Sequence, residues 1–490
     1  MGFRRGVSLA LAALLLAGPA QAQEAATSGA QILAGLTEAE IARRVQTVLD
    51  PLAGRPEFVG LSVAVARGDQ VIVDRGSGLA DLEWNQPADA ETVFRIGSVT
   101  KQFTAAAIMK LVEQGKLALD DPLARYVPDF DTGGRTVTIR QMLNHTSGIP
   151  NYTAQPEFIS KGAIIDLSQQ ELLQYVAGKA FSFEPGQGWQ YSNTNYYLLG
   201  MIIEKVSGDS YAEYLDNVFF RPLGLAHTRY GFEGRLIPKR AQGYALDPDR
   251  QRSNDQPTSM LNPGAAGALV STAGDLVRWQ IALTNGRAVS ADSFRQMITS
   301  TARTGNGDSA YGFGLFVDEL EGQTRISHGG GINGFNSSLT WLPDSALRVA
   351  VISNSQDLPS GWVEGRIAMA LTSNDPLPAL RTTPQPGAEA ALRKLIEDQA
   401  NGTPDYDTMS PQLAEAVRVQ LPRLQPLARS WGAIKAITFV RTDLDGLDTY
   451  RVDFANGGAA MFSIFLFPDG KIATAFFRPA PPADNAGNRP

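Results

Sequence analysis

Strand-like segments stand at both ends of a long region whose middle is helical, and this pattern limits the possible fold more than any other feature. Residues 58–65 and 70–74 are rich in β-branched residues and flank Arg67-Gly68-Asp69, which predicts a hairpin. Residues 120–230 alternate short helical segments with loops marked by Pro and Gly. Strand patterning returns at residues 311–317, 324–327, 336–342 and 347–353. We therefore predict an α+β fold in which distant segments form one antiparallel sheet, flanked by helices and carrying a helical lobe.

A proline-rich stretch, residues 374–387, separates this region from a shorter C-terminal one. Its prolines are typical of a semi-rigid linker. Helical and strand segments follow at residues 388–401, 410–428, 437–441, 447–454, 459–467 and 471–477, with Asp469-Gly470 as a hairpin turn. We therefore predict a main domain over residues 36–373, a small α+β domain over residues 388–478 and a disordered tail over residues 479–490.

The first 22 residues have the composition of a secretory signal peptide. Arg4 and Arg5 precede an apolar run from Val7 to Ala17, and Ala20-Gln21-Ala22 supplies a small-residue cleavage site. The alternative is a membrane anchor, but the run is shorter than a spanning helix requires, and no later segment approaches that length. We therefore expect a signal peptide over residues 1–22 and an exported protein, periplasmic or secreted, without a membrane span.

Charge and residue content exclude several classes of function. Removal of residues 1–22 leaves 41 basic and 50 acidic residues, a formal net charge of −9, which disfavours binding to nucleic acid. The chain has no cysteine, which excludes disulfides, thiolate metal sites and a cysteine nucleophile. Its three histidines, His145, His227 and His328, have no spacing typical of a metal site. We therefore expect no metal or other cofactor and a small-molecule or short-peptide substrate, while the oligomeric state stays open.

A serine and a lysine stand three residues apart at the start of a predicted helix. Ser98 and Lys101 share a helix face at this spacing. The helix that follows is rich in small and apolar residues, as a buried helix must be, and Gly115 can cap its end. A lysine at a buried helix start loses solvation, which lowers its pKa. A neutral Lys101 can take a proton from Ser98, so Ser98 is a candidate nucleophile.

Two further motifs accompany this pair. Of ten lysines only Lys101 follows a serine at this spacing, and of thirteen tyrosines only Tyr191 begins a Tyr-x-Asn, with Asn193. Of three histidines only His328 begins a His-x-Gly. In this order the motifs resemble those of the serine penicillin-recognising enzymes, in the branch of class C β-lactamases, DD-peptidases and esterases. Residues 144–150, 183–186, 267–276 and 311–314 resemble that family as well, and the likeness covers roughly residues 36–372.

The resemblance implies a β-lactamase/transpeptidase-like fold and roles for the motif residues. Ser98 would attack a carbonyl carbon and form an acyl-enzyme. Tyr191, its phenol acidified by the nearby charge of Lys101, would shuttle protons and later activate water. Lys101 would share that proton with Tyr191. The small C-terminal domain lies outside this likeness and resembles a nuclear-transport-factor-like fold.

The remaining motif residues would bind the substrate: Asn193, His328, Gly330 and Gly331. Asn193 would orient substrate and Lys101, and the backbone N–H groups of Ser98 and Gly331 would form the oxyanion hole. Gly330 and its glycine neighbours would let the strand approach the substrate closely. The β-lactamase form usually carries lysine where this chain has His328, and histidine is mostly neutral at pH 7. We therefore expect hydrolysis of an ester or amide, including a D-amino-acid peptide, with weak or no β-lactam hydrolysis.

Alternatives remain at the level of the sequence. A non-catalytic protein of this fold that recognises cell-wall peptide or a protein partner is expected to have lost an acylation group, and Ser98, Lys101 and Tyr191 are all present. A Ser-His-Asp hydrolase is disfavoured because Thr100 stands where its nucleophile elbow requires glycine. Ser98 can also be a plain helix cap, and His145 is expected to be structural.

Overall fold

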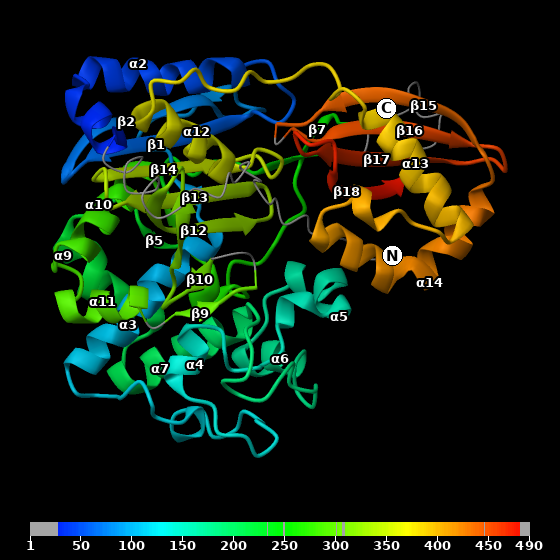
Figure 1. Cartoon of the computed structure of the whole chain (residues 1–490). Coiled ribbons are helices and arrows are strands. Elements are labelled where there is room, and N and C mark those ends of the chain that lie inside the picture. The colour runs from blue at the N-terminus through cyan, green and yellow to red at the C-terminus, as the bar shows by residue number, and fades with distance from the viewer. Residues whose placement is uncertain are drawn as a thin grey trace. The chain divides into compact units, whose positions relative to one another are not determined.

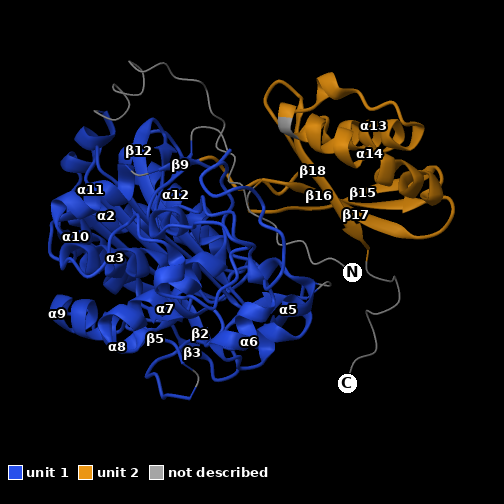
Figure 2. Cartoon of the chain, turned by 90° about the horizontal axis from the view of Figure 1, so that it is seen from below, with its two compact units in different colours: residues 1–6, 16–377 blue, residues 7–15, 378–490 orange. Residues whose placement is uncertain are grey.

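The computed structural model describes residues 28–480, apart from residues 233, 248–249, 300, 306–308 and 445. The predicted signal peptide and residues 481–490 of the predicted tail lie outside the described residues. Two compact units divide the chain between Leu377 and Pro378, and Figure 2 colours them separately.

A nine-stranded antiparallel sheet forms the centre of the first unit within its described residues (Figure 1). In spatial order its strands are β3 (Gln86–Pro87), β2 (Gln70–Asp81), β1 (Gly60–Arg67), β14 (Leu347–Ser353), β13 (Phe335–Leu342), β12 (Gln323–Ile332), β11 (Phe316–Leu320), β10 (Ala310–Tyr311) and β9 (Ala302–Arg303). The two ends of the unit meet where β1 pairs with β14, with Leu61 opposite Ser353. The predicted α+β class, with one sheet built from distant segments, is therefore confirmed.

Helices cover both faces of this sheet. Ser338 of β13 donates a hydrogen bond to α12 (Ser360–Thr372) at 3.2 Å, and Ser62 of β1 accepts one from the first residue of α10 (Ala273–Thr284) at 3.3 Å. Ser338 lies opposite Val351 and Ser62 opposite Ile352. Because neighbouring residues of a strand point to opposite faces, α12 and α10 cover opposite faces. α2 (Glu38–Leu49) packs beside α12, and a capping box of Thr37 and Glu40 starts it.

A helical lobe lies between two short paired strands, β4 (Phe94–Arg95) and β8 (Leu269–Ser271). Its first helix, α3 (Thr100–Glu113), is buried at every residue from Thr100 to Met109, which agrees with its apolar composition. α3 packs against α7 (Asn193–Ser207). The other helices of the lobe are α4 (Ile139–Leu143), α5 (Pro156–Ser160), α6 (Gln169–Gln174), α8 (Tyr211–Leu215) and α9 (Arg221–Leu223). β5 (Arg229–Tyr230) pairs with the other side of β8.

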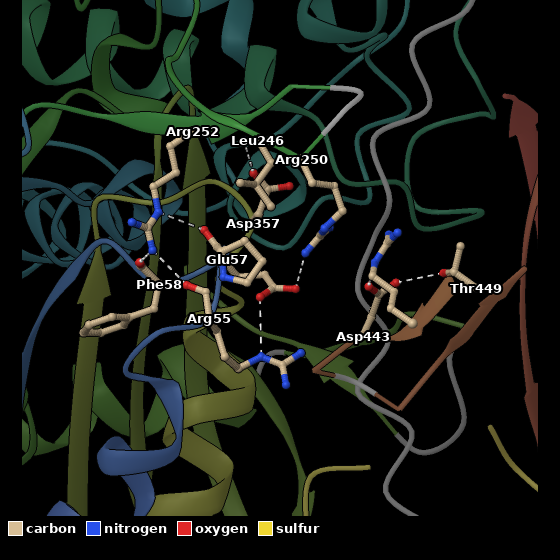
Figure 3. A network of polar contacts seen from close by, with 11 residues as sticks. Arg55, Glu57, Phe58, Leu246, Arg250, Arg252, Asp357, Asp443 and Thr449 are labelled. Atoms are coloured by element: carbon tan, nitrogen blue, oxygen red, sulfur yellow. Dashed lines mark hydrogen bonds and ion pairs between the residues drawn. The ribbon is translucent and has the colours of Figure 1, made fainter. Parts of the chain in front are cut away.

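A polar network fastens the hairpin of β6 (Tyr244–Leu246) and β7 (Arg252–Asn254) to the loop before β1 (Figure 3). Arg252 donates to the carbonyl oxygens of Arg55 at 2.9 Å and Phe58 at 2.8 Å. Glu57, which is 4% exposed, pairs with Arg55 at 3.4 Å and with Arg250. The chain continues from β7 to the 3₁₀ turn η7 (Gly264–Ala266).

Within its described residues, the second unit contains a four-stranded antiparallel sheet and two α-helices. The strands follow one another in space as in sequence: β15 (Ile434–Thr442), β16 (Asp448–Phe454), β17 (Ala459–Leu466) and β18 (Ile472–Pro479). α13 (Ala388–Asn401) and α14 (Pro411–Trp431) pack on each other and share one apolar core with the sheet. The nuclear-transport-factor-like likeness of this unit stays a prediction.

Across the residues that the structure describes, we find no helix with the length and apolarity needed to traverse a bilayer.

Candidate active site

Ser98 and Lys101 lie where β4 leads through the 3₁₀ turn η2 (Gly97–Val99) into α3. Backbone hydrogen bonds fix the turn: the Ile96 N–H donates to the Leu269 carbonyl at 3.1 Å, and the Val99 N–H donates to the Ile96 carbonyl at 3.2 Å. Lys101 is 0% exposed, and its Nζ lies 3.1 Å from Ser98 Oγ. The fold thus brings the Ser98 hydroxyl and the Lys101 amine together, as their three-residue spacing predicts.

Two further acceptors surround the Lys101 amine. Asn193 Oδ1, at the start of α7, lies 2.8 Å from Nζ, and the backbone oxygen of Ala266 in η7 lies 2.7 Å away. Burial holds the pKa of Lys101 well below its usual value, as predicted. A neutral amine has two hydrogens and one lone pair. Since the Ala266 oxygen can only accept, one hydrogen must go there.

Tyr191 precedes α7, and the centre of its ring lies 4.8 Å from Lys101 Nζ. The prediction that Lys101 acidifies this phenol is wrong. Burial raises the pKa of Tyr191 well above its ordinary value, although the nearby Ser98 hydroxyl opposes the rise. The same burial drives Lys101 toward its neutral form, so it supplies no charge to offset the effect. The Tyr191 hydroxyl is buried and makes no well-aligned hydrogen bond within the described part of the chain.

His328 lies in β12 and is 2% exposed. Its Nδ1 donates to the Gly329 carbonyl at 2.6 Å, because a carbonyl can only accept. Nε2 is therefore unprotonated and accepts from the Tyr311 hydroxyl at 3.0 Å. Burial lowers the pKa of His328 to about 3. The expected neutral histidine is confirmed, and both ring nitrogens are engaged within the protein.

The glycines after His328 differ in how closely other atoms approach the place where a side chain would begin. A Cβ on Gly330 would collide with the Ile96 carbonyl oxygen and with Ser337 Oγ. A Cβ on Gly329 would meet the Ser337 carbonyl oxygen only at 3.6 Å, an ordinary contact. Gly97 has φ +48, and a Cβ there would lie 2.9 Å from the Gly331 nitrogen. Ser98 and Gly331, the residues expected to supply the oxyanion hole, therefore belong to segments in direct contact.

The open edge of β12 faces this site. β11 pairs with β12 only from Gln323 to Ser327 among the described pairs, so residues 328–332 have no strand partner on that side. The turn η2 also contacts β12. An extended substrate can pair with such an edge.

Sequence reasoning missed three groups at the site. The Ala266 oxygen is a backbone group and leaves no side-chain signal. Tyr311 belongs to a segment that resembled the family, but its contact with His328 depends on the folded sheet. His145 is fully buried, accepts from the Ser192 N–H at 3.3 Å, and lies with its ring centre 4.3 Å from that of Tyr191. His145 was expected to be structural, and these contacts agree with that expectation while showing that it supports the Tyr191 ring.

The site can carry nucleophilic chemistry. It combines a hydroxyl, a desolvated amine within hydrogen-bond distance of it, a buried phenol and backbone N–H groups of two adjoining segments. Within the described residues, no cluster of three or more His, Asp or Glu could hold a metal ion.

Comparisons with known proteins agree with this geometry. A family model described as Beta-lactamase matches residues 45–374. Penicillin-binding protein 4* of Bacillus subtilis (strain 168) is 32% identical over 331 residues, which cover 64% of this chain and 72% of that protein. The octameric penicillin-binding protein homologue from Pyrococcus abyssi is similar in structure, with a TM-score of 0.63, 25% identity and 90% of each chain covered. D-amino acid amidase from Ochrobactrum anthropi SV3 has a TM-score of 0.60 and 28% identity over 68% of this chain and 98% of that chain.

Proposed function

The chain belongs to the beta-lactamase family, and from this premise we propose that it is an exported serine hydrolase that cleaves an ester or amide through an acyl-enzyme on Ser98. The amide substrates would include D-amino-acid amides or peptides, with β-lactams as poor substrates. One observation carries the proposal: the buried Lys101 amine lies 3.1 Å from Ser98 Oγ and has two other acceptors for its hydrogens.

Acylation begins with a proton transfer. As Ser98 Oγ bonds to the substrate carbonyl carbon, its proton passes to the Lys101 lone pair. The N–H groups of Ser98 and Gly331 stabilise the oxygen that becomes negative. When the tetrahedral centre collapses, the bond to the leaving alcohol or amine breaks. The leaving group takes a proton from Tyr191, and Lys101 restores the phenol.

Tyr191 suits the role of acid. Because burial raises its pKa, the phenol keeps its proton at neutral pH until the leaving group needs it. In deacylation, water attacks the acyl carbon and gives a proton to Lys101 by way of Tyr191. As the bond between the acyl carbon and Ser98 Oγ breaks, Lys101 returns this proton to Oγ. Each cycle thus returns Ser98, Tyr191 and Lys101 to their starting protonation.

The substrate preference rests on His328. A neutral imidazole with both nitrogens engaged offers neither charge nor a free donor to a substrate carboxylate. Binding of a β-lactam carboxylate is therefore weak, and substrates without a carboxylate at this position are favoured. The similarity to the D-amino acid amidase supports D-amino-acid amides as the first class to test.

Covalent labelling tests the nucleophile. Wild-type protein and the S98A variant are treated with a fluorophosphonate or a penicillin, and intact mass is measured. We expect one adduct on wild type and none on S98A. A folded wild type without an adduct would favour a non-catalytic binding protein.

A substrate panel tests the preference. The panel contains p-nitrophenyl esters, amides of D- and L-amino acids, and nitrocefin. We expect kcat/KM to be higher for an ester or a D-amide than for nitrocefin. Efficient nitrocefin hydrolysis without esterase activity would contradict the proposed preference. Mass analysis of the N-terminus of protein recovered from outside the cytoplasm tests export.

A further inference from the structure

A loop that none of the motifs includes is bonded to the Tyr-x-Asn segment. Residues Asn151 and Thr153 flank the start of the 3₁₀ turn η4 (Tyr152–Ala154). Asn151 Oδ1 accepts from the Asn193 N–H at 3.1 Å and from the Thr153 N–H at 3.2 Å. Thr153 Oγ1 accepts from Asn193 Nδ2 at 2.9 Å. Thr153 therefore binds the Asn193 side chain that reaches Lys101, and Asn151 binds both the Asn193 backbone N–H and Thr153.

The direction of each of these hydrogen bonds is forced. Two backbone N–H groups point at the same side-chain atom of Asn151, so that atom must be the oxygen. The Thr153 hydroxyl lies 3.0 Å from this oxygen and has one hydrogen, which it must donate there. Its lone pairs then face Asn193, which must present Nδ2 to Thr153. Asn193 consequently presents Oδ1, an acceptor, to Lys101.

The direction of the Asn193 amide also determines how the Lys101 amine is oriented toward Ser98. Asn193 Oδ1 and the Ala266 oxygen are both acceptors, so they take the two hydrogens of a neutral Lys101 amine. The lone pair is left for the third neighbour, Ser98 Oγ at 3.1 Å. With the Asn193 amide reversed, Nδ2 would occupy that lone pair and Ser98 would lose its proton acceptor.

We propose that Asn151 and Thr153 are positioning residues that set the direction of the Asn193 amide and thereby aim the Lys101 lone pair at Ser98. This inference rests on the proposed function for its kinetic consequence, but its effect on the Lys101 amine exists without any substrate.

Three variants separate positioning from structural support. T153V removes the hydroxyl at nearly constant volume, and T153S keeps it. T194V is the matched control, because Thr194 joins the same two segments through the Pro150 oxygen at 2.7 Å and the Tyr152 N–H at 3.0 Å without touching Asn151 or Asn193 side chains. The measured quantity is the second-order rate of Ser98 acylation by a fluorophosphonate, with unfolding temperature followed in parallel.

We expect T153V to lower the acylation rate about 10- to 100-fold, as misplacement of a catalytic group does. T153S should restore it, and T194V should acylate near the wild-type rate even where its unfolding temperature falls. Equal losses in T153V and T194V, a wild-type rate in T153V, or failure of T153S to restore the rate would each overturn the proposal.

The pKa of Lys101 supplies a readout independent of activity. It is measured by NMR titration of ¹³C-labelled lysine, with the Lys101 signal identified by its loss in K101M. A reversed amide withdraws an acceptor from the ammonium and donates to the neutral amine, so T153V should lower the pKa further. A loosened, wetter site would raise it instead, and a raised or unchanged pKa overturns the proposal. A lowered pKa in a chain whose wild type does not acylate would sustain the positioning role and reject the proposed function.

Discussion

Replacing Lys101 by methionine should lower the acylation rate and should remove one pH-dependent contribution to the free energy of unfolding. Lys101 is 0% exposed, and methionine has a similar length and no charge. Without a proton acceptor for Ser98, acylation should fall by about 10²- to 10⁴-fold. The stability of the variant relative to wild type should also depend on pH, because the lysine changes its protonation on unfolding.

The sign and size follow from the lowered pKa of Lys101. Between the folded and unfolded pKa values the unfolded chain binds one more proton, so the free energy of unfolding of wild type rises by about 1.4 kcal/mol per pH unit. An unfolded lysine titrates near pH ~10.4, so measurements from pH ~7 to ~9 lie on the side of the unfolded pKa where this rise occurs. His145 and His328, whose pKa values are also lowered, are mostly neutral in both states in this window. The other titrating groups are common to both chains, so the pH dependence of the wild-type minus K101M difference reports Lys101.

Urea unfolding at three pH values within this window, followed by tryptophan fluorescence, measures the effect. Trp431 is the one tryptophan of six in the second unit, so W431F in both chains confines the signal to the first unit. K110M controls for loss of a more solvated lysine of α3, whose side chain is 31% exposed. The wild-type free energy of unfolding minus that of K101M should grow with pH. A constant difference would mean that Lys101 stays protonated in the fold and would refute the neutral-amine mechanism.

Other consequences can be measured with simpler assays. G330A should push β12 away from Ile96 and lower kcat/KM for a good ester about 100-fold. G329A should change kcat/KM little, because its Cβ would meet no atom nearer than the Ser337 carbonyl oxygen at 3.6 Å. Equal effects would contradict the conclusion that only Gly330 needs the close approach. Burial raises the pKa of Glu364 to about 7, so the folded state keeps a proton that the unfolded state releases near its ordinary pKa. The wild-type free energy of unfolding minus that of E364Q should therefore fall by about 3 kcal/mol between pH ~4.3 and ~7, as measured by thermal unfolding at the two pH values. The pKa of His328 is about 3, so this residue should stay neutral from pH ~5 to ~8, around the ordinary histidine pKa. The ratio of kcat/KM for substrates with and without a carboxylate should therefore not change over this range. A gain for carboxylate substrates at the acid end would show that His328 becomes charged.

Much of the fold followed from local patterns. The hairpin of residues 58–74 and the strands over residues 336–342 and 347–353 were predicted because β-branched runs and turn residues act locally. The predicted strand over residues 311–317 is wrong, because β10 ends at Tyr311 and β11 begins at Phe316. The length of β12 was not, because its glycines carry no strand signal and become strand residues only by pairing with β13. The helix α14 continues to Trp431 through Pro422 and Pro426, past the predicted end at residue 428.

For the site, the sequence by itself determined which residues are candidates. Ser98, Lys101, Tyr191, Asn193 and His328 stand out because each motif occurs once in the chain. Residue type alone also predicted that His328 would be neutral and that a buried Lys101 would have a lowered pKa.

The protonation states of the site residues and the directions of their hydrogen bonds were decided only by the tertiary structure. Lys101 meets Asn193 and Ala266 from 92 and 165 residues away, and the Tyr311 hydroxyl reaches His328 only across the folded sheet. The phenol of Tyr191 was expected to be acidified, yet its pKa rises because burial removes both its water and the lysine charge. A pKa depends on the solvent that the whole fold excludes, and the direction of a hydrogen bond depends on every partner in its chain. Neither is a property of a motif.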